Sequence, residues 1–233
     1  LQRLEQLPPG ASRRTMALRI QLKASRLAHA THSALETARL LAKHGGLSPE
    51  AAASIIRGLV IEQIQHTHDA EQLQQTWRSL HPADCDAPDI ALAAARKLVE
   101  LQGDAQQARS WLLPVLEQFI QAPQSLTSTQ ALRLFTVLPQ ALDGLDATWL
   151  ARLETAHRAA PQEPRLQYLA GMACMEQQLW GKGEQLLQGA VQRLDDAPLR
   201  ARAWTALAVV AEQREDSQAA AQAWRQAALQ NQQ

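Results

Sequence analysis

The spacing of small and large apolar residues between Leu166 and Ala228 constrains this chain more than any other feature. Three alanines, Ala208, Ala220 and Ala227, recur where two antiparallel helices would touch. Larger apolar residues accompany them at regular spacing, at Trp204, Leu207 and Trp224. We expect the two tryptophans to pack between helices. One helix pair cannot bury its own apolar face, so this pattern predicts stacked helix pairs.

A second copy of the pattern lies directly before the first. Gly171, Gly183 and Ala190 take its small positions. The equivalent residues Gly171 and Ala208 lie 37 positions apart, slightly more than the roughly 34-residue period of the tetratricopeptide repeat. The turn from Asp195 to Pro198 accounts for the surplus, because turns absorb length at little cost. We therefore predict an all-α fold, a tetratricopeptide-like right-handed superhelix (α-solenoid) of about six antiparallel helix pairs.

The helices are predicted to form one helical-repeat domain over residues 1–233. Divergent N-terminal helices occupy residues 12–82, degenerate repeats residues 88–161, and the two clearest tetratricopeptide repeats residues 164–230. Helix stop and start signals separate the helices, at Gly45, Gly46, Ser48, Pro49 and Asp146. The segment from His81 to Pro88 is expected to be a connector.

The repeat register continues through the middle of the chain. Counting Leu92 as repeat position 4 places Arg96 at position 8, which is normally small. Gly103 and Asp104 then occupy the turn between the two helices of this pair. Because a long arginine stem can carry its charge out to water, we expect Arg96 to snorkel from this position.

Charge is balanced over the whole chain but not along it. The 23 Lys and Arg residues equal the 23 Asp and Glu residues, and the pI near 7.2 argues against a nucleic-acid partner. The first helix of the chain is nevertheless predicted to be basic. Its surface residues are Arg13, Arg14, Arg19, Lys23 and Arg26. This basic surface is either a landing site for an anionic partner or membrane headgroups, or a solvated helix face.

Motifs for catalysis, nucleotide binding and metal binding are absent from the sequence. It contains no GxGxxG, Walker, GxSxG or HExxH motif. Its two cysteines form no CxxC pair. The sequence supplies no set of companion ligands for its two histidine pairs, which are His29 with His32 and His66 with His68. We therefore expect a protein that is not an enzyme and has no metal site.

Binding is predicted on the concave surface of the superhelix, which the first helix of each pair lines. The residues expected there, which we call the concave strip, are Arg165, Tyr168, Met172, Met175, Glu176, Arg202, Thr205, Val209 and Glu212. Methionine repacks against varied partners and tyrosine adds contact area at small entropic cost, so these side chains suit a protein partner. The alternative is that Met172 and Met175 pack on a further helix and the chain itself fills the groove.

The run from Tyr168 to Gly183 goes beyond a generic repeat and contains the core Gln178-Leu179-Trp180-Gly181-Lys182. Two further stretches accompany it, from Ser12 to Leu27 and from Gly46 to Trp77. On these residues the chain resembles the HemY-type tetratricopeptide proteins of proteobacterial haem biosynthesis, over nearly its whole length.

This resemblance implies a location and a class of partner. HemY-type proteins are bacterial inner-membrane proteins with two N-terminal transmembrane helices, which are absent here, followed by a soluble helical-repeat region that we expect in the cytoplasm. The chain begins at Leu1 rather than Met, as a fragment would. We therefore expect a non-catalytic interaction scaffold whose protein partners are haem-pathway enzymes. The sequence does not predict an oligomeric state.

Direct binding of porphyrin or haem is the alternative function, and it belongs to a different class. The scaffold function requires no cofactor. The alternative function would make haem the bound cofactor. An unrelated flavin-dependent oxidase of the haem pathway shares the family's name, but it would need a dinucleotide fingerprint that this sequence lacks.

Overall fold

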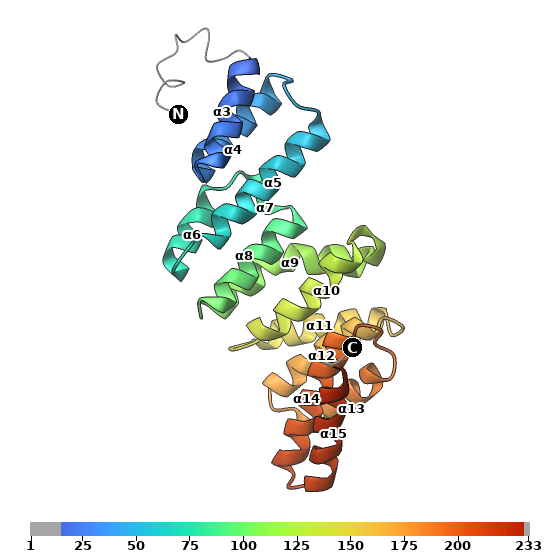
Figure 1. The fold of residues 1–233 in the computed structure, drawn as a ribbon. Coiled ribbons are helices and arrows are strands. Elements are labelled where there is room, and N and C mark those ends of the chain that lie inside the picture. The colour runs from blue at the N-terminus through green and yellow to red at the C-terminus, as the bar shows by residue number, and fades with distance from the viewer. Residues whose placement is uncertain (1–14, 231–233) are drawn as a thin grey trace. The chain divides into compact units, whose positions relative to one another are not determined.

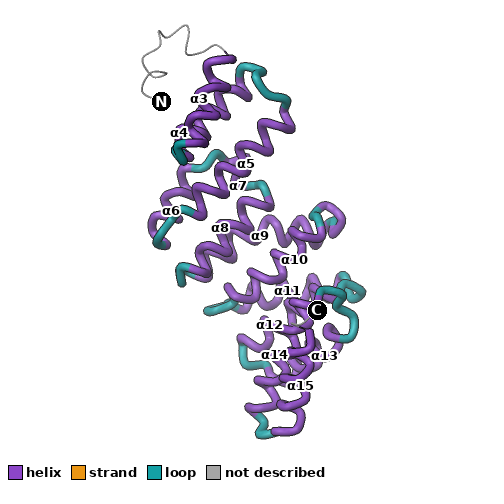
Figure 2. Tube along the Cα trace, viewed as in Figure 1, coloured by secondary structure: helices purple, strands orange, loops and turns teal. Residues whose placement is uncertain are grey.

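The structure, a computed structural model, describes residues 15–230, so Arg13 and Arg14 of the predicted basic surface lie outside it. The described residues form thirteen α-helices, α3 to α15, and two 3-10 helices, with no strand (Figure 1; Figure 2). Helices that follow one another in sequence pack in adjacent pairs. The all-α class is therefore confirmed, and the superhelical arrangement of the pairs stays a prediction.

The chain divides into two compact units, Leu1–Lys97 and Leu98–Gln233, with the division inside helix α8 (Pro88–Glu100). The helices of the first unit before α8 are α3 (Thr15–Leu27), α4 (Thr31–Lys43), α5 (Pro49–Gln65), α6 (Ala70–Ser79) and α7 (Pro82–Cys85). Its core includes Leu18 and Leu22 of α3 and Leu41 of α4, all almost fully buried. The prediction of one continuous domain stays a prediction.

Capping residues start helices of the first unit, at Ser48 as the sequence predicts and at Asp69. The Ser48 hydroxyl accepts a hydrogen bond from the amide three residues on, at 3.2 Å, and Pro49 takes the first helical position of α5. The Asp69 carboxylate caps α6 in the same way, at 2.7 Å from the amide nitrogen of Gln72. Gly45, with a φ of 65°, supplies the left-handed residue at which the chain leaves α4.

The segment from His81 to Pro88 is more than a connector, contrary to the prediction. It contains the short helix α7 (Pro82–Cys85), whose first turn is capped by the imidazole of His81. Asp84 of this helix forms an ion pair with Arg39 of α4, with 2.6 Å between the charged atoms. A helix of one turn shows no period in sequence, so the pattern could not reveal it.

Helix α8 follows part of the predicted register. Its buried residues include Leu92 and Ala95, as predicted, together with Ile90, Ala91, Ala94 and Leu98. Arg96, which the repeat pattern places at a small contact position, is exposed, in agreement with the expectation that its long stem carries the charge out to water. Burying a guanidinium at a close helix contact would cost much more free energy.

The second unit continues after α8 with seven α-helices among its described residues. They are α9 (Ala105–Gln121), α10 (Ser128–Val137), α11 (Ala147–Ala159), α12 (Pro164–Glu176), α13 (Trp180–Val191), α14 (Ala197–Gln213) and α15 (Ser217–Gln230), with 3-10 helices η1 (Pro123–Ser125) and η2 (Leu138–Ala141). Asp146 caps α11 as predicted, accepting from the Trp149 amide at 2.8 Å. Thr127 and Gln130 form a capping box at α10, which the sequence reading overlooked.

A buried arginine holds the segment between α10 and α11. Arg109 of α9 is 3% exposed, and its Nη1 donates to the carbonyls of Ala141 and Asp143 at 2.5 and 2.7 Å. Its Nη2 donates to the Gly144 carbonyl at 3.2 Å. The Ala141 carbonyl is at the end of η2, and the other two carbonyls lie in the turn that follows. One cation therefore satisfies three acceptors that would otherwise lack donors.

The small positions of the two C-terminal helix pairs are contacts between helices, as predicted. Gly171, Gly183 and Ala190 are buried, and so are the equivalent Ala208, Ala220 and Ala227. A Cβ atom added at Gly171 would lie 2.8 Å from Cγ of Leu187, which is closer than carbon atoms approach without a bond. Helices α12 and α13 therefore meet at a point where only glycine fits.

The two tryptophans of the last helix pair lie in different environments. Trp204 is half-buried, which agrees with a packing role. Trp224 is 42% exposed, so the prediction that it fills a space between helices is wrong. Its indole Nε1 instead donates to Glu212 Oε1 of α14 at 2.8 Å. The repeat pattern marks where large residues are tolerated, and it does not by itself show which of them become buried.

The contact between Gly171 and Leu187 makes a testable prediction. Gly171→Ala should lower the free energy of unfolding by about 1–3 kcal/mol, because the new methyl group overpacks a closed contact. Gly58→Ala in α5 is the matched control, since no atom lies within 4 Å of its added Cβ. That change should raise the free energy of unfolding by about 0.5–1 kcal/mol, through helix propensity alone. Urea denaturation followed by circular dichroism measures both, and equal effects of the two changes would contradict the contact.

Candidate interaction surfaces

The concave strip predicted on α12 and α14 is not an open groove. Tyr168 is completely buried (0% exposed), so it cannot touch a partner, contrary to the prediction. Burial raises the pKa of its phenol to about 12, and the positive charge of Arg202 opposes that rise. Within the described part of the chain, the Tyr168 hydroxyl has no hydrogen-bond partner.

Both arginines of the strip bind groups of the chain itself. Arg165 Nε lies 2.7 Å from Asp196 Oδ2 and joins the start of α12 to the start of α14. Arg202 of α14 donates to the carbonyl of Thr136 in α10. Helix α10 contacts α14, and η2 contacts α12, so this part of the chain covers the face that the strip was predicted to open. The alternative in which the chain fills its own groove therefore describes this end of the strip.

The remaining side chains of the strip divide between packing and exposure. Met175 packs over Gly183, where an added Cβ would lie 2.8 Å from its sulfur, and Met172 is half-buried. The Thr205 hydroxyl donates to a carbonyl of its own helix, at 3.0 Å. The exposed members are Glu176, Val209 and Glu212. The strip thus contributes separate exposed side chains but no continuous contact surface.

An open groove does exist between helices α13, α14 and α15, and we call it the α13–α15 groove. Its volume is about 630 Å³. Its buried or half-buried apolar lining consists of Trp204, Leu207, Ala211, Ala219 and Ala223. Its polar lining consists of Glu184, Gln188, Gln192, Gln222, Arg225 and Gln226. An apolar floor with a polar rim is the usual anatomy of a protein-binding surface.

Sequence reasoning assigned the floor of this groove to packing and overlooked its rim. The signal was present in the glutamines. Gln188 of α13 lies four residues before Gln192, the C-cap residue of that helix, and Gln222 and Gln226 are four residues apart on α15, so each pair points to one side of its helix. Nothing in the sequence showed that the two faces border the same groove, because that depends on how the helix pairs pack.

The first unit holds another groove, with a volume of about 610 Å³, between the α4–α5 turn, α5 and α7. Much of its lining is alanine, from Ala42, Ala52, Ala53, Ala83 and Ala87. Its charged lining residues are already paired, since Arg57 lies 3.3 Å from Asp89 and Asp84 lies 2.6 Å from Arg39. A ligand in this groove would contact mainly apolar surface and would find few polar groups without a partner.

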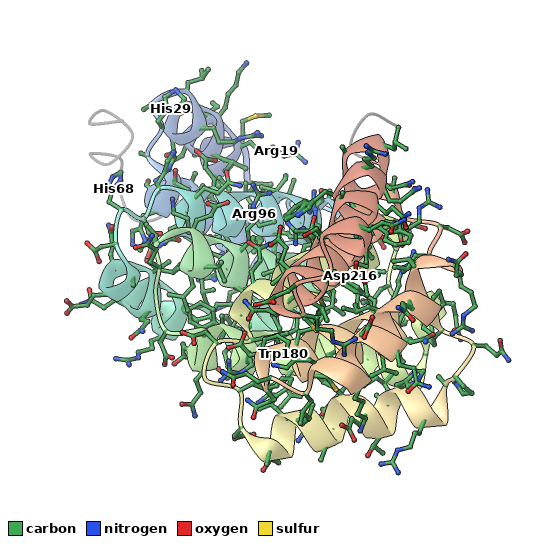
Figure 3. All side chains as sticks on the ribbon, turned by 90° about the horizontal axis from the view of Figure 1, so that it is seen from below. Arg19, His29, His68, Arg96, Trp180 and Asp216 are labelled. Carbon is green, nitrogen blue, oxygen red and sulfur yellow. The ribbon has the colours of Figure 1, made fainter. Side chains whose placement is uncertain are left out.

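The described part of the basic surface lies on α3. Lys23 and Arg26 are exposed. Arg19, labelled in Figure 3, is also exposed, and its Nη2 donates to the Gly46 carbonyl at 2.9 Å. A slot of about 410 Å³ runs beside these three cations, with leucines of α3, α4 and the following turn as its apolar lining.

The described residues bring together no cluster of side chains that could hold a metal ion. Among residues 15–230, no three His, Cys, Asp or Glu side chains cluster as a metal site would require. His29, His32, His66 and His68 are all exposed. None of the helices in this range combines the length and the apolar character needed to cross a bilayer.

Comparisons with known proteins add no relative to this description. The sequence matches no protein-family model and no curated protein.

The burial of Tyr168 makes a second prediction. Because Tyr168 is the only tyrosine in the chain, the whole tyrosinate signal reports on this residue. Absorbance at the tyrosinate band should show no ionisation of the folded protein until the pH approaches about 12. The unfolded chain ionises near its ordinary pKa of about 10. Since the unfolded state loses this proton first, stability should fall as the pH rises from 10 towards 12, by up to about 3 kcal/mol.

Tyr168→Phe separates this effect from the titration of lysines. The variant should be as stable as the original protein at neutral pH, because the deleted hydroxyl has no partner among the described residues. It should also lose less stability between pH 10 and 12. An ordinary tyrosine titration near pH 10 in the folded protein would contradict the buried position.

Proposed function

We propose that this chain is a non-catalytic interaction scaffold that binds a segment of a partner protein in the α13–α15 groove. The observation that carries the proposal is the lining of that groove, an apolar floor bordered by glutamines on two helices. Its volume of about 630 Å³ suits the side chains of a short segment. Trp204 at its floor is the residue type that most often anchors such contacts.

The chemistry of the groove favours an amphipathic helix as the bound segment. Alanines at 211, 219 and 223 make the floor shallow, so the partner would bring its own large apolar residues to one side. The glutamine rows can donate and accept hydrogen bonds without carrying charge. The charged groups of the rim are Glu184, which is paired with Arg214, and Arg225. A helix with an apolar face and mostly uncharged polar flanks fits this lining.

The resemblance to HemY-type proteins suggests which proteins supply the segment. On that basis we propose late enzymes of haem biosynthesis as the partners, with the longer protein held at the bacterial inner membrane by a segment outside this chain. The groove itself is argued from its residues and would retain its proposed role with a different partner.

A single charge placed in the groove tests the proposal. Ala219→Glu puts a carboxylate on the apolar lining, where a bound segment would have to bury it without a partner. Binding to purified late haem-pathway enzymes, measured by biolayer interferometry, should weaken by about tenfold or more. Ala221→Glu is the matched control, because it makes the same change on the exposed face of the same helix and should leave affinity within about twofold.

Both substitutions lie in the first turns of α15, where a carboxylate is favourable, so neither should prevent folding. Binding that is equal for the two variants would place the partner elsewhere on the chain. Absence of binding by the unaltered protein to any of these enzymes would remove the haem-pathway assignment and leave the groove to be tested with other partners.

A further inference from the structure

Helix α3 has two opposite apolar faces, although a helix at the surface of a unit needs only one. Leu18 and Leu22 are almost fully buried and face α4. Met16, Ile20 and Leu27 are 66%, 53% and 74% exposed. Met16 and Ile20 each lie two residues from Leu18, or about 200° around the helix, so the exposed residues form a ridge opposite the core.

Cations occupy one flank of this ridge. Arg19, Lys23 and Arg26 follow one another at spacings of four and three residues, which places them on one side of α3. The helix contains no acidic residue. Arg19 is anchored by its hydrogen bond to the Gly46 carbonyl, and its position beside the ridge is therefore fixed. The exposed side of α3 thus combines an apolar crest with a purely cationic flank.

The slot beside the cations extends the apolar surface inward. It measures about 410 Å³ and is lined by Arg19, Leu22, Lys23, Arg26, Leu27, Leu41 and Leu47. Leu27 belongs to both the slot and the ridge. A ligand on this side of α3 would therefore meet apolar surface at two depths, with positive charge between them.

We propose that α3 is a peripheral membrane-binding helix that docks on anionic phospholipid. Charge complementarity carries this assignment. The ridge would enter the boundary of the acyl chains, the three cations would contact lipid phosphates, and the slot would receive part of one acyl chain. An acidic peptide is less suited, because a peptide seated on the cationic flank would leave Met16 and Ile20 in water.

Vesicle flotation of the full chain tests this surface. The protein should float with vesicles of equal parts phosphatidylcholine and phosphatidylglycerol, and should stay behind with phosphatidylcholine alone. Each cation near an anionic surface contributes about fivefold to affinity, so Lys23→Gln with Arg26→Gln should weaken binding about 25-fold. Salt at about 1 M should have a comparable effect. Ile20→Ser with Leu27→Ser, which removes the ridge but no charge, should weaken binding by about tenfold or more.

Matched controls lie on other helices. Arg78→Gln with Arg133→Gln removes two exposed cations from α6 and α10, and Leu229→Ser removes a leucine that is 54% exposed. Both control variants should bind within about twofold of the original protein. All the altered side chains are exposed, and circular dichroism should show unchanged folding.

Four results would overturn the proposal. The first is failure of the unaltered protein to float with the anionic vesicles. The second is equal flotation with both kinds of vesicle. The third is unchanged binding of the α3 variants relative to the controls. The fourth is binding to poly-glutamate without flotation, which would assign the surface to an acidic protein partner.

Discussion

The close contact of α12 with α13 is the interaction on which the rest of the second unit depends. Gly171 has no side chain, and this absence lets Leu187 lie directly against the backbone of α12. The equivalent contact in the next pair is made at Ala208. Because both pairs close in the same way, their second helices α13 and α15 come to border the same groove over α14.

Hydrogen bonds from Arg109 of α9 and Arg202 of α14 decide which face of the unit remains available. Arg202 donates to the carbonyl of Thr136, and Arg109 donates to the carbonyls of Ala141, at the end of η2, and of Asp143 in the turn after it. These bonds hold α10 and η2 over the face that contains Tyr168. An incoming partner would have to break several buried hydrogen bonds to reach that face, whereas the α13–α15 groove is open without any such cost.

The sequence predicted local features well and long-range ones poorly. Ser48 and Asp146 cap helices as expected, and Gly171 and Gly183 sit at helix contacts, since these roles depend on near neighbours or on a fixed period. Tyr168 shows the limit. Its repeat position predicts that it faces a partner, but a period of one repeat contains no information about η2 and α10, which come from an earlier part of the chain and contact α12 and α14.

The same limit explains the binding surface. The glutamine rows and the alanine floor are visible in the sequence as separate helix faces, and only the packing of α13, α14 and α15 joins them into a groove. On α3 the sequence predicted the cations, but it did not show that Met16, Ile20 and Leu27 face outward. A period alone cannot say which of two apolar faces is covered.

Hydrogen–deuterium exchange of the full chain, with and without a bound partner, tests the central claim most directly. Binding in the α13–α15 groove predicts slower exchange in α13 and α15, with α10 and the buried face around Tyr168 unchanged. Slower exchange confined to α12, together with faster exchange in α10, would show that the partner displaces α10 from the face that contains Tyr168 and would contradict the account.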